Sequence, residues 1–415
     1  MFRKIKDLQD VVAWGLCLGC GICKYAIKSG TVELVNIEST GIRPLFDAEA
    51  AAVSAEFLDI CPGYSLDASV LTGSMQNPTP ADREYGPTLE IWEGYAADPE
   101  LRHRGSSGGV LSALALWCLE QEKMAFVLHA GMDPDKPWLN KTFTSRTRSE
   151  LLARAGSRYA PASPCDGLDK IENSDQPCVF IGKPCDTAAV IAARRSRPTL
   201  DQHLGAVFTF FCAGTPSTRG TLDLLERMHI QRDTVEELRY RGDGWPGGFT
   251  VTRGEGARRD FKPYQQAWRE LTPYVPLRCR LCPDGLGRVA DISCGDAWEQ
   301  YDDARSNPGM SIVLVRTQRG REVLRGAVAA GYVNLAPASS DAVFAAQPHL
   351  LSKRQELFGR LLAFRLLLIP IPQFLGFSQF HGWIRLPLSR KIRTLAGTLK
   401  RAVSRGWWKP LHCLD

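Results

Sequence analysis

Residues 179–195 read VFIGKPCDTAAVIAARR: a short apolar run, a turn with Gly and Pro, and then an Ala-rich stretch that favours a helix. The same order returns in residues 205–228, GAVFTFFCAGTPSTRGTLDLLERM, and in residues 310–332, MSIVLVRTQRGREVLRGAVAAGY. Strands that alternate with helices are typical of α/β domains, whose crossover helices connect parallel strands. These stretches predict an α/β fold with a largely parallel or mixed sheet.

Outward from this stretch, residues 91–96 and 124–130 add strand candidates, and residues 110–120, VLSALALWCLE, add a helix. Residues 68–87 cluster Gly, Pro, Asn and Ser without periodicity, which is typical of a linker. We therefore expect four parts. They are an N-terminal segment (1–67), a linker (68–87), an α/β domain (88–345) and a C-terminal tail (346–415).

The composition of the 415 residues, 44% hydrophobic and 23% charged, excludes a disordered or collagen-like chain. Thirteen cysteines are too few for a disulfide-stapled scaffold, so metal ligation is the favoured role. Asp7 and Asp10 precede any apolar signal region, so we expect a cytoplasmic chain. Arg365 and Pro370 interrupt the longest apolar run, so no membrane-spanning helix is expected.

The net charge of +6 is unevenly distributed, because residues 357–414 contain ten Lys or Arg and no Asp or Glu. The rest is slightly acidic, which argues against a nucleic-acid partner. Four apolar residues recur at helical spacing among the basic ones: Ile392, Leu395, Leu399 and Val403. This predicts either a helix at an anionic membrane surface, peripheral at the inner face, or a helix docked on the body with its charges in water.

The densest motif is CLGCGIC at residues 17–23, a C-x2-C-x2-C run that is typical of three corners of an iron–sulfur cubane. Ile27 occupies the place of the fourth cysteine of bacterial ferredoxins, but Cys61-Pro62 follows after one strand candidate (31–37) and one helix candidate (48–58). We expect a [4Fe-4S] cluster on Cys17, Cys20, Cys23 and Cys61. The alternatives are a structural zinc site and a redox C-x-x-C pair.

A second, more dispersed set consists of Cys185, Cys212, Cys279 and Cys282. The first two follow predicted strands, and the ends of adjacent parallel strands meet at one sheet edge. A second four-thiolate site is therefore expected there. Cys118 shares an apolar helix face with Leu111 and Leu114, and we interpret it as a core residue.

Residues 104–109, RGSSGG, directly precede the helix that begins near residue 110. Small residues leave the first-turn amides of a helix free for a phosphate, which the helix dipole also attracts. A cofactor pyrophosphate is the expected occupant; the alternative is a purely structural capping turn.

Eight motifs in chain order resemble the family of coenzyme F420 hydrogenase and dehydrogenase beta subunits. They are CLGCGIC (17–23), CPG (61–63), RGSSGGV (104–110), GSRYAPAS (156–163), FIGKPCDTAA (180–189), FFCAGTPS (210–217), YRGDGWPGG (240–248) and CRLCPDGLGRVADISCGDAW (279–298). The family includes reductases such as 7-hydroxymethyl chlorophyll a reductase and a ferredoxin-type divinyl chlorophyllide reductase.

The resemblance implies FAD and [4Fe-4S] clusters, with a ferredoxin-like N-terminal segment and a flavin-binding α/β domain whose two family halves meet near residue 165. At most one N-terminal cluster is implied, because Ile27-Lys28 replaces the Cys-Pro of many members. The flavin-site positions that it implies are Ser106, Ser107, Gly108, Gly109, Gly156, Ser157, Arg158 and Tyr159, and the positions near flavin or substrate are Tyr240, Arg241, Gly242 and Trp245.

The function that follows is an oxidoreductase in which a ferredoxin-like donor loads the clusters, FAD collects electron pairs and a small organic substrate receives hydride. The alternative is an F420-reducing or F420-oxidising electron-transfer subunit of a larger complex. A non-catalytic relay subunit and a zinc module are further alternatives. Arg158 and Arg241 are expected either to stabilise anionic groups or to form structural ion pairs.

Overall fold

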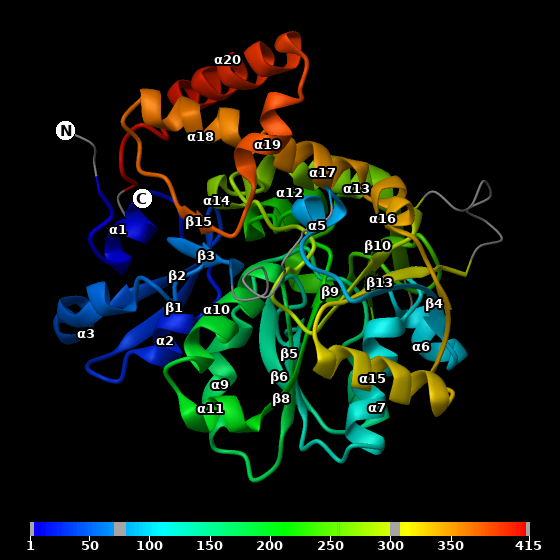
Figure 1. Ribbon diagram of the computed structural model, residues 1–415. Coiled ribbons are helices and arrows are strands. Elements are labelled where there is room, and N and C mark those ends of the chain that lie inside the picture. Colours follow the sequence, from blue (N-terminus) through cyan, green and yellow to red (C-terminus); the bar gives the residue numbers. More distant parts are fainter. Residues whose placement is uncertain (1–3, 70–79, 255, 257, 299–307, 412–415) are drawn as a thin grey trace.

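The computed structural model describes residues 4–69, 80–254, 256, 258–298 and 308–411. Its centre is an eight-stranded sheet with the order β14-β4-β13-β12-β8-β7-β5-β6 (Figure 1). The strands are β4 (Glu90–Ala96), β5 (Val127–Met132), β6 (Asn140–Ser145), β7 (Cys178–Gly182), β8 (Leu204–Phe210), β12 (Ile292–Asp296), β13 (Ser311–Val315) and β14 (Val333–Pro337).

The sheet is mixed. β5, β7, β8 and β12 run parallel in its centre, whereas β6, β13, β4 and β14 pair antiparallel with their neighbours. The three predicted pairs of strand and helix are confirmed as β7–α10, β8–α12 and β13–α15. Of the two predicted forms of the sheet, largely parallel or mixed, the mixed one is confirmed, because β13 returns antiparallel beside β12. The three helices span α10 (Pro184–Arg194), α12 (Thr218–Arg227) and α15 (Gln318–Ala329).

Both faces of the sheet are covered. Successive side chains of β7 point to opposite faces, and there are buried residues on each face. On one face Val179 packs with α7 (Val110–Glu120) and α15, and on the other Phe180 packs with α10. Cys118 is fully buried on α7 within the first of these cores, which confirms its assignment as a core residue. The remaining helices around the sheet are α6 (Pro99–Arg104), α8 (Arg148–Ala153), α9 (Leu168–Glu172) and α11 (Pro198–His203).

The N-terminal segment consists of α1 (Leu8–Ala13), α2 (Ile22–Ala26), the antiparallel pair β1 (Val32–Ile37) and β2 (Gly41–Phe46), and α3 (Ala48–Val53). The predicted strand and helix are both present, although the helix ends early and continues as a 3-10 turn to Phe57. In the predicted linker, residues 80–85 form the short helix α5 (Pro80–Tyr85), and residues 70–79 lie outside the described residues.

A small antiparallel sheet of β9 (Val235–Arg239), β10 (Gly248–Arg253) and β11 (Arg258–Pro263) lies beside the main one. Its β9–β10 connection contains residues 240–247, the loop predicted near the flavin or substrate. It is followed by α13 (Tyr264–Leu271) and α14 (Leu277–Arg280).

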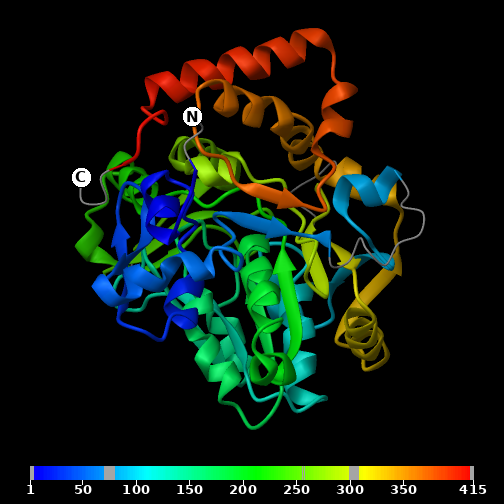
Figure 2. The same cartoon turned by 60° about the vertical axis from the view of Figure 1, so that its left-hand side comes forward.

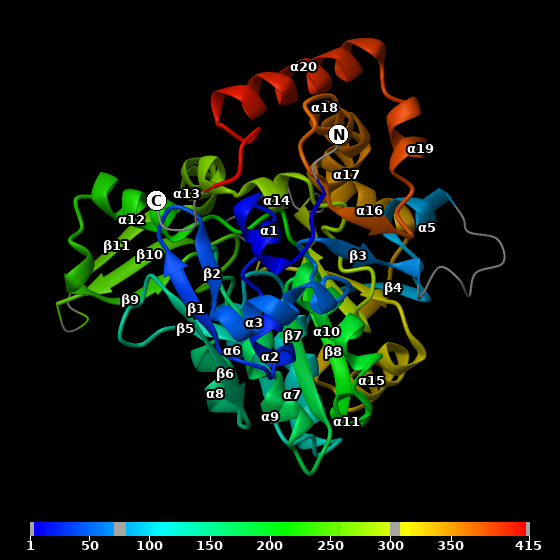
Figure 3. The same cartoon turned by 90° about the vertical axis from the view of Figure 1, so that its left-hand side faces the viewer.

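The C-terminal part is helical and stacks at one end of the molecule (Figures 1 and 3). It comprises α16 (Ser340–Ala346), α17 (Pro348–Gln355), α18 (Leu357–Leu366), β15 (Gln373–Leu375), α19 (Gln379–Ile384) and α20 (Leu388–Ser404). β15 pairs with β3 (Ser65–Asp67) of the N-terminal segment, so residues far apart in sequence lie side by side (Figure 2).

The predicted amphipathic helix exists as α20, and it packs on α18 through Thr394, Thr398 and Ala402. Ile392 and Val403 are each 59% exposed, whereas Leu395 and Leu399 are half-buried, so half of the predicted apolar row faces away from the body. The packing of α20 on α18 confirms that this helix is docked on the body. Its contact with a membrane surface stays a prediction. In the described parts of the chain, no helix combines the length and apolarity needed to span a bilayer.

Candidate functional site

Two cavities lie where the central parallel strands end, at Gly182 of β7, Phe210 of β8 and Asp296 of β12. The carboxyl edge of parallel strands is where α/β folds place their binding sites, because the loops from neighbouring strands converge there. One cavity is lined by thiols and the other by a glycine-rich loop and aromatic rings.

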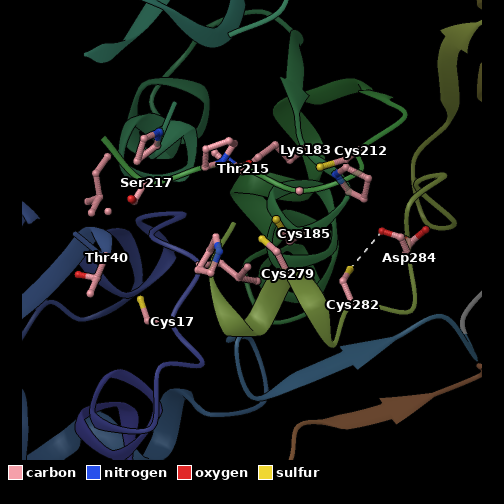
Figure 4. A pocket seen from close by; sticks show the side chains of 18 of the residues that line it. Cys17, Thr40, Lys183, Cys185, Cys212, Thr215, Ser217, Cys279, Cys282 and Asp284 are labelled. Atoms are coloured by element: carbon pink, nitrogen blue, oxygen red, sulfur yellow. Dashed lines mark hydrogen bonds between the residues drawn. The ribbon is translucent and has the colours of Figure 1, made fainter. Parts of the chain in front are cut away.

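All four cysteines of the dispersed set line the thiol cavity: Cys185, Cys212, Cys279 and Cys282 (Figure 4). Cys185 is at the start of α10, Cys212 follows β8, and the other two are on and after α14. The structure thus brings together residues from three distant segments, as the sheet-edge argument predicted. Cys17 of the N-terminal motif lines the same cavity.

Burial raises the pKa of the Cys212 thiol to about 12, and the neighbouring Cys279 adds to the shift. Lys183 lines the cavity, but its Nζ lies 2.7 Å from Asp186 Oδ2, and this carboxylate balances its charge. Lys353 also lines it and donates to the carbonyl of Ala213. Buried thiols with adjacent cations suit a thiolate-bound centre, because a metal cluster replaces the thiol protons that burial otherwise retains.

The four N-terminal thiols also lie near one another. Burial raises the pKa of Cys23, and Cys17, Cys20 and Cys61 each raise it further. The run needs its glycines, because Gly19 has a φ of 70° and a Cβ there would lie 2.7 Å from the carbonyl oxygen of Ile42. Within the described ranges, no three His, Cys, Asp or Glu side chains close around a single metal ion. The four-thiolate [4Fe-4S] site on these cysteines therefore stays a prediction.

The larger cavity has a volume of about 280 Å³, near the lower end of the roughly 300–1,000 Å³ usual for small-molecule pockets. Ser106, Ser107 and Gly109 line it, together with the first residues of α7. Gly109 caps α7 with a φ of 75° and no side chain caps the helix, so its first-turn amides are available to a ligand. This is the arrangement that binds phosphate.

Gly108 is the one residue of the predicted glycine-rich set, Ser106 to Gly109, that packs away from the cavity. It does not line the cavity, and a Cβ there would lie 2.6 Å from the carbonyl oxygen of Gly94 and 2.9 Å from the amide of Ser311. Its small size therefore lets the loop pack on the sheet. Ser107 is held similarly, since its hydroxyl lies 2.9 Å from both the Met310 carbonyl and Ser311 Oγ.

Gly156, Ser157, Arg158 and Tyr159 all line the larger cavity. The Ser157 amide donates to Ser106 Oγ over 2.6 Å, which joins this loop to the glycine-rich loop. The Arg158 guanidinium donates to Asn140 Oδ1 and to backbone carbonyls, including those of Pro137 and Leu139. Arg158 is thus bound by structural acceptors, although by carbonyls rather than by the predicted ion pair.

In the β9–β10 loop only Arg241 lines the cavity, and it forms a two-pronged ion pair with Asp296 over 2.7 and 2.8 Å. Burial opposes the charge of Arg241, but Asp296 more than offsets this, and the pKa of Arg241 lies above its ordinary value. Three predicted residues are not in the lining: Trp245 donates to Asp296, Tyr240 bonds Thr221 over 2.6 Å, and Gly242 packs against Arg104.

Sequence reasoning missed several residues of this cavity, and the aromatic ones are the most informative. Tyr264 and Trp298 are stacked with their ring planes 8° apart, and the Arg241 guanidinium lies 4.5 Å from the Tyr264 ring centre. Trp298 and Asp296 belong to the GDAW motif, and Tyr264 and Trp268 are four residues apart on α13. His129 also lines the cavity, but no sequence motif marks it.

The two cavities share a wall. Lys183, Cys212, Gly214 and Thr215 line both of them. The thiol set and the ring-lined cavity are therefore direct neighbours, separated by the segment that follows β8.

Two models of one family match the chain. The N-terminal model of the coenzyme F420 hydrogenase/dehydrogenase beta subunit matches residues 91–168, and the C-terminal model matches residues 175–341. Together they cover the main sheet, the glycine-rich loop and the dispersed cysteines. The N-terminal cysteines and the helices after α16 lie outside them.

Named relatives agree. The beta subunit of F420-dependent formate dehydrogenase 1 from Methanococcus maripaludis is 24% identical over 59% of this chain, which spans 60% of that relative. The coenzyme F420 hydrogenase beta subunit of Methanosarcina barkeri is 27% identical over 58% of this chain and 79% of its own length.

A solved structure shares the fold. A chain of the F420-reducing [NiFe] hydrogenase complex from Methanosarcina barkeri aligns with a TM-score of 0.54 and 21% identity, covering 73% of this chain and 99% of its own. The family resemblance predicted from the eight motifs is confirmed, and the chain belongs to the coenzyme F420 hydrogenase/dehydrogenase beta subunit family.

Proposed function

We propose that this chain is the flavin- and iron–sulfur-binding subunit of a larger oxidoreductase that exchanges electrons with coenzyme F420. The relatives are named as beta subunits of F420-dependent formate dehydrogenase and of coenzyme F420 hydrogenase, which supports the F420-linked alternative over direct reduction of a small organic molecule. FAD would occupy the larger cavity and [4Fe-4S] clusters would be bound by the two cysteine sets.

The shared wall carries this proposal. Cys212 lines both cavities, so a centre on the dispersed thiols would lie directly beside a ligand in the ring-lined cavity. Electron transfer between cofactors requires such closeness, and a purely structural thiol site does not. A centre on the N-terminal cysteines would in turn lie beside the dispersed thiols, because Cys17 lines the thiol cavity as well.

The cofactors, when bound, would convert between single electrons and hydride. The chain's own residues place and tune them. The first-turn amides of α7 and the Ser106–Ser157 contact would hold the phosphates, and Tyr264 and Trp298 would flank the ring system. Arg241, fixed by Asp296, supplies a positive charge at the cavity wall without free movement.

The test is anaerobic purification with iron, sulfide, zinc and flavin analysis, followed by addition of oxidised F420 to the dithionite-reduced protein. We expect about two clusters and one FAD per chain, and loss of the F420 absorbance on mixing. A colourless protein that contains zinc would overturn the proposal, and so would a flavoprotein that leaves F420 oxidised.

A second candidate is a reductase that takes electrons from a ferredoxin-like donor and passes hydride to a small organic substrate. The observation that favours it is the N-terminal cysteine set, which lies outside both family models and, with a bound cluster, would give the chain its own electron entry. Reduction of the protein by a ferredoxin, with no reaction toward F420, would select this function.

A further inference from the structure

A third cavity, of about 340 Å³, lies among α14, α18 and α20, apart from the two cavities described above. It is within the size range of small-molecule sites. Phe364 and Leu281 supply apolar wall, and four arginines line it: Arg280, Arg360, Arg393 and Arg401. The helices α18 and α20 lie beyond residue 341, where the family match ends.

The charge around this cavity is unbalanced. Glu356 is the one acidic side chain in its lining, and its carboxylate is divided between Arg360 Nη2 at 2.8 Å and Arg390 Nε at 2.9 Å. Arg280 is fixed by the carbonyls of residues 272, 273 and 275, which accept its hydrogen bonds but carry no net charge. Among the residues that line this cavity, Arg401 donates a hydrogen bond only to the neutral Oγ1 of Thr398, at 3.4 Å.

The arginines also affect one another. The pKa of Arg280 is lowered by burial first, and then by the charges of Arg405, Arg401 and Arg360. The buried Nε of Arg360 has no hydrogen-bond partner. Arg393 and Arg401 are exposed, so the cavity is open to solvent on their side. Like charges gathered around one cavity raise the free energy of the fold, and a bound anion would lower it.

We propose that this cavity binds a multiply charged phosphate-type anion. Guanidinium groups match the oxygens of phosphate in pairs, and four of them around one space suit two or more negative charges. The anion has two chemical sources, a soluble phosphorylated molecule and the headgroup of an anionic phospholipid. The exposed apolar residues Ile392 and Val403 on α20 favour a phospholipid headgroup as the source, because they could contact the membrane beside it.

The experiment titrates the full chain, as isolated with its cofactors, with inorganic pyrophosphate at constant ionic strength. Calorimetry and thermal unfolding are the readouts. We expect saturable binding and an increase in melting temperature, because the anion binds the folded state. Arg401→Gln should weaken binding by roughly tenfold or more, since a charge-assisted contact is lost. Arg401→Lys, which keeps the charge, should retain most of it.

Two further variants test whether a packing defect, instead of a lost anion contact, explains weaker binding. Arg393 is exposed, so Arg393→Gln should weaken binding without lowering the melting temperature of the free protein. Arg365 is exposed on α18 but does not line the cavity, so Arg365→Gln should bind as the unchanged chain does. Equal binding by Arg401→Gln and the unchanged chain would overturn the proposal, as would a response that sodium chloride reproduces.

Binding to lipid vesicles distinguishes a phospholipid headgroup from a soluble phosphorylated molecule as the ligand. Sedimentation with phosphatidylglycerol vesicles that depends on Arg401 and that pyrophosphate displaces supports the headgroup as the ligand. Pyrophosphate binding without such sedimentation supports a soluble phosphorylated ligand. These outcomes are distinct from the redox proposal, because the Arg401 and Arg393 variants separate pyrophosphate binding in this cavity from binding at the α7 amides.

Discussion

Arg241 and Asp296 form the buried pair on which the larger cavity depends. The carboxylate accepts two hydrogen bonds from the guanidinium and a third from Trp245 Nε1 at 2.9 Å. The Arg241 charge also lies against the Tyr264 and Trp298 rings. Removing one partner of such a pair leaves a buried charge without compensation, which costs more than the pair contributes.

Asp296→Asn should therefore lower the free energy of unfolding by about 3 kcal/mol and reduce the amount of flavin retained on purification. Urea unfolding and flavin analysis measure the two effects. The matched control is Asp135→Asn, since Asp135 is exposed and its ion pair with Lys141 is worth little. Similar losses in the two variants would contradict a special role for the buried pair.

His129 gives the fold a dependence on pH. Burial first, and then the Arg154 charge, lower the pKa of His129 to about 4. Unfolded histidine has a pKa near 6.5, so the unfolded state takes up the proton first and stability is lost as the pH falls from about 6.5 to 4. The loss attributable to this residue is roughly 2–3 kcal/mol.

His129→Gln should flatten the pH dependence of unfolding in this window, while His349→Gln, at an exposed position, should leave it unchanged. Glutamine retains a partner for Ser145, which now bonds His129 Nε2 at 2.8 Å. Denaturant unfolding at several pH values checks this. Parallel curves for His129→Gln and the unchanged chain would show that other groups carry the dependence.

At the level of elements, the predictable parts were those with a strong local pattern. The apolar β7 followed by the Ala-rich α10 was identified from residues 179–195. β11 was missed because its RRDFKP sequence is polar and mostly exposed, and β15 because three residues form it only by pairing with β3. Strand ends indicate Cys185 and Cys212, and the C-x2-C spacing indicates Cys279 and Cys282. The placement of Gly108 and Trp245 depends on packing that no local pattern encodes.

We expect α20 to be the part of the chain that contacts membranes. Its outward apolar residues Ile392 and Val403, with a surrounding excess of basic residues, should bind anionic membranes. Ile392→Asp should reduce binding to phosphatidylglycerol vesicles several-fold with little change in stability, because the side chain is exposed. Ser404→Asp makes the same charge change away from the apolar row, and should bind nearly as well. Equal losses would mean that charge alone decides.

At the scale of the whole molecule, the order of the sites matters most. Cys17 connects the N-terminal thiols to the dispersed set, and Cys212 connects that set to the ring-lined cavity. In the proposed function, electrons from a one-electron donor would therefore pass Cys212 before they reach the flavin. Hydride exchange between the flavin and F420 would not require that path.

Cys212→Ser should separate these two activities. We expect about one cluster's worth of iron to be lost, flavin to be retained, and flavin reduction by a one-electron donor to slow by tenfold or more. Flavin reduction by reduced F420 should persist, because it needs only the larger cavity. Cys118→Ala removes a thiol from the α7 core and should preserve both reactions. Stopped-flow absorbance with each reductant distinguishes the outcomes. Equal slowing of both reductions would mean that Cys212 serves the flavin cavity itself, and unchanged rates would exclude it from the electron path.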